Sequence, residues 1–398
     1  MCNFVQKTRE VAMKNDEKTS AYHLVNLKQE RITYARELRG LTKKSLAEKI
    51  HKSPAAITQF EAGAKPDIDT LVSIAKALSL PLSFFSVEKE YATPQVEEFH
   101  FRARASVTQM MKYQSRRYAE RVVDLFNFLE EYGVDFPVEN ISPVQQKLRD
   151  GMTITEVAAL VRAEWGLQDR PIHELFSLFE RNGIFIILLD QEYNDLEACA
   201  TWFGNRPCIM LAYKKFEGAS SRIHFDLGHE LGHLFLHDES FSETEKEPQA
   251  HEFASSFLMP QDRYALDSPK KWHFGMFLEI KRKWHVSLQA ALRRSRDLNI
   301  ISDSSYRWGM IDLSKKGFRQ KEPGEFPIGK PSLLSQAIEL IKDRLTLDEL
   351  AQAIHTFPDE LELILRSQKV SEESIQSMKR YPQARKAKIV SFTPRNNS

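Results

Sequence analysis

Cysteine is scarce in this chain, and its three cysteines, Cys2, Cys199 and Cys208, show no CxxC spacing. We therefore expect neither a disulfide framework nor a thiolate zinc finger, and we expect a reducing, cytoplasmic location. Long apolar runs are also missing, because the longest one, residues 184–189, is far shorter than the roughly 18 residues that a membrane-spanning helix needs. The first 25 residues are polar and charged, which predicts no secretory signal and no membrane partner.

Charge of one sign is not in excess either. The 56 Lys and Arg residues nearly balance the 55 Asp and Glu residues, which gives a net charge of +1. A uniformly basic coat for nucleic acid is excluded, but a local basic patch is not. With 42% hydrophobic and 28% charged residues, the 398-residue chain is neither wholly disordered nor a coiled-coil rod. A prior of about 150 residues per domain predicts two or three domains.

Helical periodicity, short β-branched runs and turn residues divide the chain into five regions. We expect a multidomain protein, mainly α, with one α+β part. In that part, residues 184–189 are predicted as a buried strand, and 198–203 with 208–212 as a hairpin around Gly204-Asn205-Arg206-Pro207. The regions are a flexible lead-in over 1–25, a four-helix module over 26–85, a connector with a long amphipathic helix over 86–150, the α+β domain over 151–320, and a helical hairpin with a basic tail over 321–398.

Residues 27–85 have the pattern of a helix-turn-helix module. Thr42 caps the second helix, and Ser53 caps the third, which begins with Pro54. In such a module the third helix lies in the major groove of DNA. The string LTKKSLAEKIHKSPAAITQFEAG resembles the lambda-repressor-like (XRE) family, and the resemblance covers the whole module. A four-helix module that binds only protein is the alternative.

The resemblance implies which residues contact a double-stranded operator, to which we expect a homodimer to bind. Gln59 can pair with adenine, and Ala and Thr methyl groups suit the methyl group of thymine. Residues 26–85 carry ten basic and six acidic side chains, a net charge of +4. The family usually has Gln in place of Lys43, so the contact there is expected to be electrostatic. The DNA contacts expected are Ser53, Ala55, Ala56, Thr58 and Gln59 on the third helix and Lys43, Lys44, Lys52 and Lys65 around it.

His229, Glu230 and His233 form an HExxH motif. On a helix this spacing places both imidazoles on one face, about 6 Å apart, where one Zn²⁺ can take a nitrogen from each. Glu230 projects from the adjoining position and can act as a general base. Apolar residues surround the motif, and buried imidazoles and carboxylates need partners or a metal. The alternative is a helix whose two histidines are exposed or satisfied within the core.

A zinc site also requires a third ligand. His237 lies eight residues beyond His229, about 12 Å along the helix axis, so a compact site with all three histidines would be strained. A carboxylate on the following helix is better placed, and Glu247 stands at such a helix start. Its i+4 neighbour His251 could orient the site from outside the ligand set.

The string RIHFDLGHELGHLFLH followed by EPQAHEFASSFLMP is similar to the ImmA/IrrE family of zinc metallopeptidases. Its members carry HExxH and then a helix ending in Leu-Met-Pro, and the resemblance spans residues 150–320. By position it implies His229 and His233 as ligands of Zn²⁺, Glu230 as the general base and Glu247 as the third ligand.

Two departures from the family pattern bear on the site. Gly228 replaces the usual Ala before the motif, which costs little. His251 replaces the usual Asn or Asp and adds a second candidate ligand. For the group that stabilises the oxyanion, the candidates are Tyr213, Arg222 and His251.

Near the C-terminus, the segment 345–355 repeats Leu, Thr, Leu, Ala, Ile and His at the spacing found in 41–51. Pro358 corresponds to Pro54, but the outward positions are acidic, which phosphates would repel. We expect a helical hairpin for domain packing or partner binding and no second DNA reader. Chance similarity between two Leu-rich helix pairs is the alternative.

These features together predict a bacterial or phage-type regulator, acting in a stress response or a toxin-antitoxin system. A zinc endopeptidase domain would cleave the chain itself, within or next to 86–105, or a partner regulator protein, and so relieve repression. The substrate peptide would lie along the hairpin around 198–212. The alternative is a non-catalytic repressor or antitoxin that uses the zinc domain as a structural or sensing module.

Overall fold

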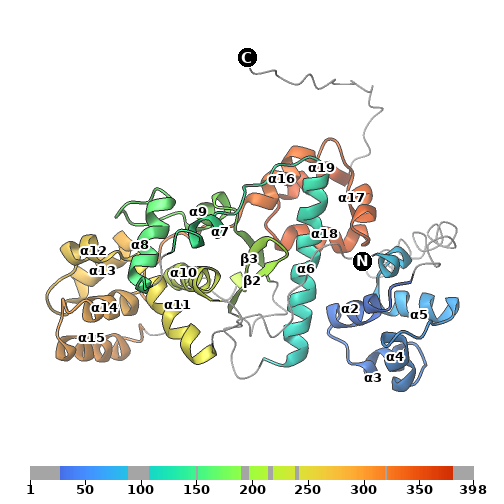
Figure 1. Cartoon of the computed structure of the whole chain (residues 1–398), viewed down its shortest axis with the longest axis horizontal. Helices are drawn as coiled ribbons and strands as arrows, with labels where there is room; N and C mark the ends of the chain where they lie inside the picture. The colour runs from blue at the N-terminus through green and yellow to red at the C-terminus, as the bar shows by residue number, and fades with distance from the viewer. Residues whose placement is uncertain are drawn as a thin grey trace, which may run out of the picture.

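The structure is a computed structural model, and it describes residues 27–87, 107–148, 151–189, 197–213, 218–237, 242–318 and 321–379. The described chain is mainly helical with one three-stranded sheet (Figure 1), as the sequence predicts. The lead-in over 1–25, nearly all of the connector segment 86–105 and the basic tail after 379 lie outside the described residues. No described helix is both long and apolar enough to span a bilayer.

The N-terminal module is built as the caps predict. It comprises α2 (Glu30–Leu38), α3 (Lys43–Lys49), α4 (Pro54–Glu61), α5 (Ile68–Leu78) and the 3-10 helix η2 (Leu82–Ser86). The Thr42 side chain accepts a hydrogen bond from the Ser45 N–H, and that of Ser53 accepts one from the Ala56 N–H. These bonds satisfy N–H groups that the first turn of a helix leaves open. Ile32, Leu46 and Ile57 meet in its fully buried core.

The sheet consists of β1 (Phe185–Leu188), β2 (Ala198–Phe203) and β3 (Arg206–Leu211) in the order β1-β3-β2. β3 runs parallel to β1 and antiparallel to β2. The hairpin is tighter than expected, because Gly204 at φ 62° and Asn205 form the whole turn. The β2–β3 pairing therefore continues through Arg206 and Pro207, which we had assigned to the turn.

The two faces of the sheet belong to different hydrophobic clusters. Ile186, Ile209 and Leu211 pack against the helices of the α+β part, whereas Phe185, Ile187 and Met210 pack against the long helix and the C-terminal helices. The remaining helices are α6 (Gln109–Glu131), α7 (Ser142–Gln145), α8 (Ile154–Glu164), α9 (Leu175–Arg181), α10 (Ser220–Leu236), α11 (Glu243–Leu258), α12 (Gln261–Asp267), α13 (Phe274–Trp284), α14 (Leu288–Asp297), α15 (Asp303–Lys315), α16 (Leu333–Ile341), α17 (Leu347–Ala353), α18 (Pro358–Ser367) and α19 (Glu372–Lys379).

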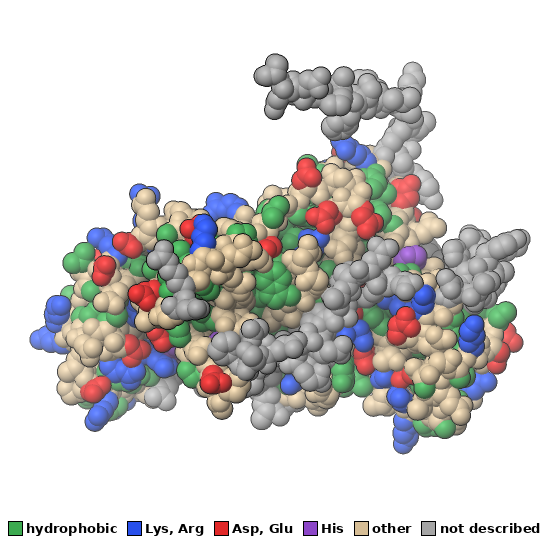
Figure 2. Space-filling view, viewed as in Figure 1, with side chains coloured by type: hydrophobic (Ala, Val, Ile, Leu, Met, Phe, Trp, Pro, Cys, Tyr) green, Lys and Arg blue, Asp and Glu red, His purple; other side chains and the backbone are tan. Residues whose placement is uncertain are grey.

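Helix α6 stands between the N-terminal module and the sheet (Figure 1) and contacts α2. The predicted C-terminal hairpin corresponds to α17 and α18, and the structure adds α16 before it and α19 after it. On the face shown in Figure 2, acidic and basic side chains are interspersed over the described surface. That distribution agrees with the balanced composition of the chain.

Candidate metal centre

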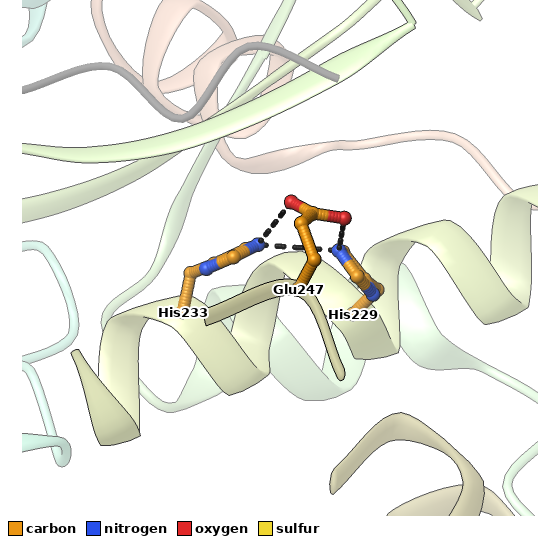
Figure 3. Close-up of side chains that lie close together, drawn as sticks. All are labelled: His229, His233 and Glu247. Carbon is orange, nitrogen blue, oxygen red and sulfur yellow. Dashed lines mark hydrogen bonds and ion pairs between the residues drawn. The ribbon is translucent and has the colours of Figure 1, made fainter. Parts of the chain in front are cut away.

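The two histidines of the HExxH motif lie on one face of α10 and are both buried. Their Nε2 atoms are 3.1 Å apart (Figure 3). The i, i+4 spacing of a helix places one ring a turn beyond the other, which allows both nitrogens to converge on one point. The local geometry is therefore the one expected for His229 and His233.

Glu247 reaches the same point from α11 (Figure 3). Its Oε2 lies 3.4 Å from the Nε2 of His229, and its Oε1 lies 3.4 Å from the Nε2 of His233. The hydrogen bonds from the two imidazoles, that from His229 foremost, hold the pKa of the Glu247 carboxyl well below its usual range. The three predicted ligands thus offer ligand atoms that all lie within 4.8 Å of one another.

This donor set fits zinc. Structural and catalytic zinc sites use imidazole nitrogen and carboxylate oxygen at about 2.0–2.2 Å, so two ligand atoms of one tetrahedral ion lie about 3.3 Å apart. The separations of 3.1 and 3.4 Å observed here match that value. Glu247 is partly exposed, with 46% of its side chain accessible, so the site opens to solvent on the side of this residue.

Two glycines allow α11 to approach α10 closely enough for Glu247 to reach the histidines. A Cβ atom on Gly232 would lie 3.1 Å from the Cα and 3.2 Å from the carbonyl oxygen of Ala250, which belong to the backbone of α11. A Cβ atom on Gly228 would meet only side-chain atoms, 3.3 Å from Leu258 and 3.5 Å from Ala254. The backbone contact at Gly232 therefore sets the distance between the two helices.

His237 supports the site from behind His233 and takes no place among the three converging ligand atoms. Its Nδ1 is 3.0 Å from the Nδ1 of His233, and its Nε2 is 3.1 Å from the Oε1 of Gln249. If the Nε2 of His233 is left to bind a metal, its Nδ1–H donates to His237, which donates in turn to Gln249. No sequence pattern points to Gln249, because its partner His237 follows another helix.

The general-base candidate, Glu230, is buried next to the ligands on α10. This helix contacts β2, which carries Cys199. Burial raises the pKa of the Cys199 thiol well above its usual range, and the nearby charge of Glu230 raises it further. The thiol therefore stays protonated and gives the site no thiolate ligand.

The three oxyanion candidates are spread over two places. His251 and Arg222 line a cavity of about 370 Å³ that also includes Phe225. There the Nε2 of His251 lies 3.2 Å from the Nη1 of Arg293. Tyr213 does not line this cavity, and its hydroxyl donates to the Gly329 carbonyl at 3.1 Å.

The predicted DNA-reading helix, α4, presents most of its expected contacts to solvent. Ala56 is partly buried, and the Lys43 ammonium pairs with Glu61 at 3.2 Å. Lys44 lies 4.0 Å from Glu48 in an exposed pair. The exposed members are Ser53, Ala55, Thr58 and Gln59, together with Lys52 and Lys65.

Comparison with known protein families identifies two parts of the chain. Residues 32–85 match the Helix-turn-helix family, and residues 179–296 match the M78 peptidase family, described as the IrrE N-terminal-like domain. The chain joins these two domains. No curated protein matches the chain.

The helix-turn-helix domain ends with η2, and the IrrE N-terminal-like domain contains all three candidate ligands together with Glu230. Helices α6, α8 and α16–α19 lie outside both matched ranges. The chain is therefore a regulator-type protein with a DNA-binding domain and a peptidase-like domain, and it carries further helices that neither family accounts for.

Proposed function

We propose that this chain is a DNA-binding transcriptional regulator whose IrrE N-terminal-like domain is a zinc-dependent endopeptidase. The domain would cleave the chain itself or a partner regulator and so relieve repression. The observation that carries the proposal is the convergence of His229, His233 and Glu247 beside the buried Glu230. The set comprises two neutral ligands, one anionic ligand and a separate carboxylate, as hydrolysis by an HExxH site requires.

His229, His233 and Glu247 would hold the ion, and a zinc ion bound there supplies Lewis acidity at the scissile carbonyl. Glu230 would accept the proton of the attacking water, because it lies next to the ligands and is not one of them. The His237–Gln249 chain would keep the Nε2 of His233 deprotonated. Arg222 and His251, which line the cavity of about 370 Å³, are the proposed donors to the oxyanion.

The substrate would bind as an extended strand. β2 contacts α10, and among the described residues its strand partner is β3 alone. A peptide added to the other edge of β2 gains backbone hydrogen bonds independent of its sequence, as in other cases of β-augmentation. A substrate peptide at this edge of β2 would lie along the 198–212 hairpin, as we expect from the sequence.

The DNA part of the proposal rests on α4. Its exposed residues Ala55, Thr58 and Gln59 are free to meet base edges, and Lys52 and Lys65 stand nearby for phosphates. We propose that two chains bind a palindromic operator, one to each half-site. A helix-turn-helix on the same chain as a peptidase also raises the effective concentration of a cleavable connector to about the millimolar range, which favours cleavage at 86–105.

Metal analysis tests the site directly. The purified chain is expected to hold one zinc ion, Glu247→Ala and His233→Ala are expected to lose it, and Glu230→Gln is expected to keep it, since the base is not a ligand. His237→Ala is the matched histidine control and should keep zinc with a weaker affinity. Full zinc retention by Glu247→Ala would refute the ligand set and favour His251 or His237 as the third ligand.

A further inference from the structure

The C-terminal helices α16–α19 repeat the build of the helix-turn-helix domain. α2 and α16 each have nine residues, and α3 and α17 each have seven. A fourth helix follows in both cases, α5 in the first unit and α19 in the second. We call residues 333–379 the second unit. It lies outside the matched helix-turn-helix range.

The turn between the two central helices is the same in backbone detail. Ile50 has φ −108° and ψ 11°, and the following His51 has φ 54°. Ile354 has φ −95° and ψ 14°, and the following His355 has φ 52°. A left-handed residue ends other helices of this chain too, as at Asn299 and Lys369, so the specific part of the likeness is that the histidine and its turn recur at the same place in the repeated sequence.

Hydrogen bonds and caps around the turn agree as well. The Lys52 N–H donates to the Ala47 carbonyl at 3.0 Å, and the Thr356 N–H donates to the Ala351 carbonyl at 2.8 Å. Thr42 and Thr346 cap the second helix of each unit, and Pro54 and Pro358 open the third. The buried pairs that correspond are Leu46 with Leu350, Ala47 with Ala351, Ile50 with Ile354, and Ile57 with Leu361.

The second unit has lost the chemistry that DNA requires. Leu347 and Thr356 stand where the first unit has Lys43 and Lys52, and both are buried. The exposed Asp348 replaces Lys44. On the third helix, the positions of Ala55, Ala56 and Thr58 are taken by Asp359, Glu360 and Glu362. Carboxylates at reading positions repel phosphates, so this helix cannot approach a DNA backbone favourably.

One of these acidic residues binds the first unit. Glu360, on α18, receives two parallel hydrogen bonds from Arg39, at 2.8 Å from Nη1 to Oε1 and 2.7 Å from Nη2 to Oε2. The same guanidinium donates to the carbonyls of Leu78 and Ser79, at the end of α5. Bidentate pairing of this kind fixes direction as well as distance. Both side chains are largely buried, so solvent screens the pair only in part.

Helix α6 completes the contact. Its Arg117 donates to Glu37 of α2 at 2.8 Å, and its Arg117 carbonyl accepts from the Tyr34 hydroxyl at 3.2 Å. At the opposite side, the side chain of Gln368, just after α18, bonds both the N–H and the carbonyl of Leu188 in β1. The second unit is therefore joined to the DNA-binding domain at one end and to the sheet of the peptidase-like domain at the other.

We propose that residues 333–379 are a second helix-turn-helix unit in which the helix that would read DNA binds the DNA-binding domain of its own chain instead. The partner of this surface is the basic end of α2, recognised through Arg39 by Glu360. Docking then fixes α4 relative to the candidate metal centre, because the same unit is bonded to β1. A cut in the connector 86–105 leaves this contact in place, so release of the DNA-binding domain also requires the Arg39–Glu360 pair to open.

Charge reversal in the full chain tests the docking. Spin labels at Lys76→Cys in α5 and Gln376→Cys in α19, with Cys2→Ser as background, report the distance between the two units by pulsed electron resonance. We expect one narrow distance in the parent, its loss in Arg39→Glu and in Glu360→Arg, and its recovery in the double variant, where the pair is re-formed with opposite sign. A narrow distance in both single variants, or no recovery in the double, would overturn the proposal.

Glu372→Arg is the matched control, because it breaks an exposed ion pair with Arg366 in the same unit. It should leave the distance narrow. If Glu372→Arg broadens the distance distribution as much as Glu360→Arg does, any charge change loosens the unit. That result would count against a specific docking contact.

A second experiment asks which unit reads DNA, and it rests on the proposed DNA-binding function. In the full chain, Lys43→Glu with Lys44→Glu should abolish sequence-specific binding, whereas Asp348→Ala, at the position that corresponds to Lys44, should leave it unchanged. If sequence-specific binding survives Lys43→Glu with Lys44→Glu, the inference that the second unit does not bind DNA is wrong. If the parent binds no DNA at all, the proposed function fails, while the spin-label distances still decide the docking.

Discussion

At the scale of single residues, the candidate site depends on which nitrogen of His233 carries its proton. The Nε2 faces His229 and Glu247, while the Nδ1 faces His237, whose own Nε2 faces Gln249. The amide oxygen of Gln249 can only accept, so it fixes the direction of both imidazole hydrogen bonds. Gln249, which orients the site, is thus two positions from the ligand Glu247 in sequence. It acts through His237, on the side of His233 that faces away from Glu247.

We predict that Gln249→Leu weakens zinc binding by about 10–100-fold without changing the number of ions bound, because the chain that holds His233 loses its acceptor. Competition with a fluorescent chelator measures the affinity. Gln289→Leu, in the wall of the cavity lined by Arg222 and His251, is the control and should leave the affinity unchanged. Equal affinity in Gln249→Leu and the parent would show that His237 is oriented by other contacts.

The sequence could predict the ligands but not their support. The HExxH spacing identifies His229 and His233, and the helix start after the motif identifies Glu247, because each signal lies within one helix. Gln249 and the close approach at Gly232 depend on how α10 and α11 pack, and no spacing rule joins residues of two helices. The sequence also places Arg206 and Pro207 in the turn, whereas in the structure they pair with Phe203 and Trp202 of β2.

A buried histidine on α10, His224, makes the stability of the chain depend on pH. Burial, with the nearby His285 and His173, lowers the pKa of His224 to about 3 from an ordinary value of 6.5. The unfolded state therefore binds a proton below pH 6.5 that the folded state does not bind. We predict that this group lowers the free energy of unfolding by about 1 kcal/mol for each pH unit as the pH is lowered from 6 to 4.

Urea unfolding of the parent and of His224→Phe over this range measures the effect. The variant keeps an aromatic ring against Phe326 and should show a flatter dependence on pH. Identical slopes would mean that His224 takes up its proton in the folded state.

At the scale of elements, the pairing of α10 with α11 decides whether Glu247 reaches the histidines. Gly232 faces the backbone of α11, and Gly228 faces flexible side chains. The two positions differ by one helical turn on the same face, so they form a matched pair of substitution sites.

We predict that Gly232→Ala displaces α11, costs about 1–3 kcal/mol of stability and loses most of the bound zinc. Gly228→Ala should keep both, since the tip of Leu258 can move aside and alanine favours a helix. Thermal unfolding with metal analysis compares the variants. Normal zinc content in Gly232→Ala would show that the two helices have more freedom than the contact distances indicate.

Only part of the second unit could be predicted from the sequence. The recurrence of Leu, Thr, Leu, Ala, Ile and His over 345–355, with Pro358 after it, predicts the hairpin of α17 and α18. α16 and α19 were not predicted as parts of the same unit. They take the places that α2 and α5 have in the first unit, but no sequence motif is common to these helices. The sequence predicts a hairpin for domain packing or partner binding without naming its partner, and the structure pairs Glu360 with Arg39 of a distant segment.

At the scale of the whole molecule, α6 connects two of the three hydrophobic clusters, and the sheet separates these from the third. Tyr118 of this helix packs against both the cluster of the DNA-binding domain and the cluster behind the sheet. The described parts therefore form a continuous chain of contacts from α4 to the metal centre. Under the proposed function, cleavage would act on a DNA-binding domain that is held in place, with α4 exposed on it.

We predict that the full chain binds an operator with an affinity that falls steeply with salt, as phosphate contacts release counterions. Gln59→Ala should relax base preference, whereas Lys52→Ala should weaken binding to all sequences and reduce the salt slope by about 1. Titrations of specific and scrambled duplexes at several salt concentrations separate the two effects. A uniform loss in both variants would mean that Gln59 contacts the backbone and not a base.

Cleavage by the zinc-loaded full chain tests the central claim most directly. Intact-mass analysis follows wild type and Glu230→Gln over time, alone and with candidate partner regulators, at equal zinc content. The account predicts new termini within or next to 86–105, or in a partner, in wild type only, because Glu230→Gln keeps the ligands and removes the base. If both proteins stay uncut, leave every partner uncut and repress a reporter equally, the endopeptidase is contradicted and the non-catalytic repressor stands.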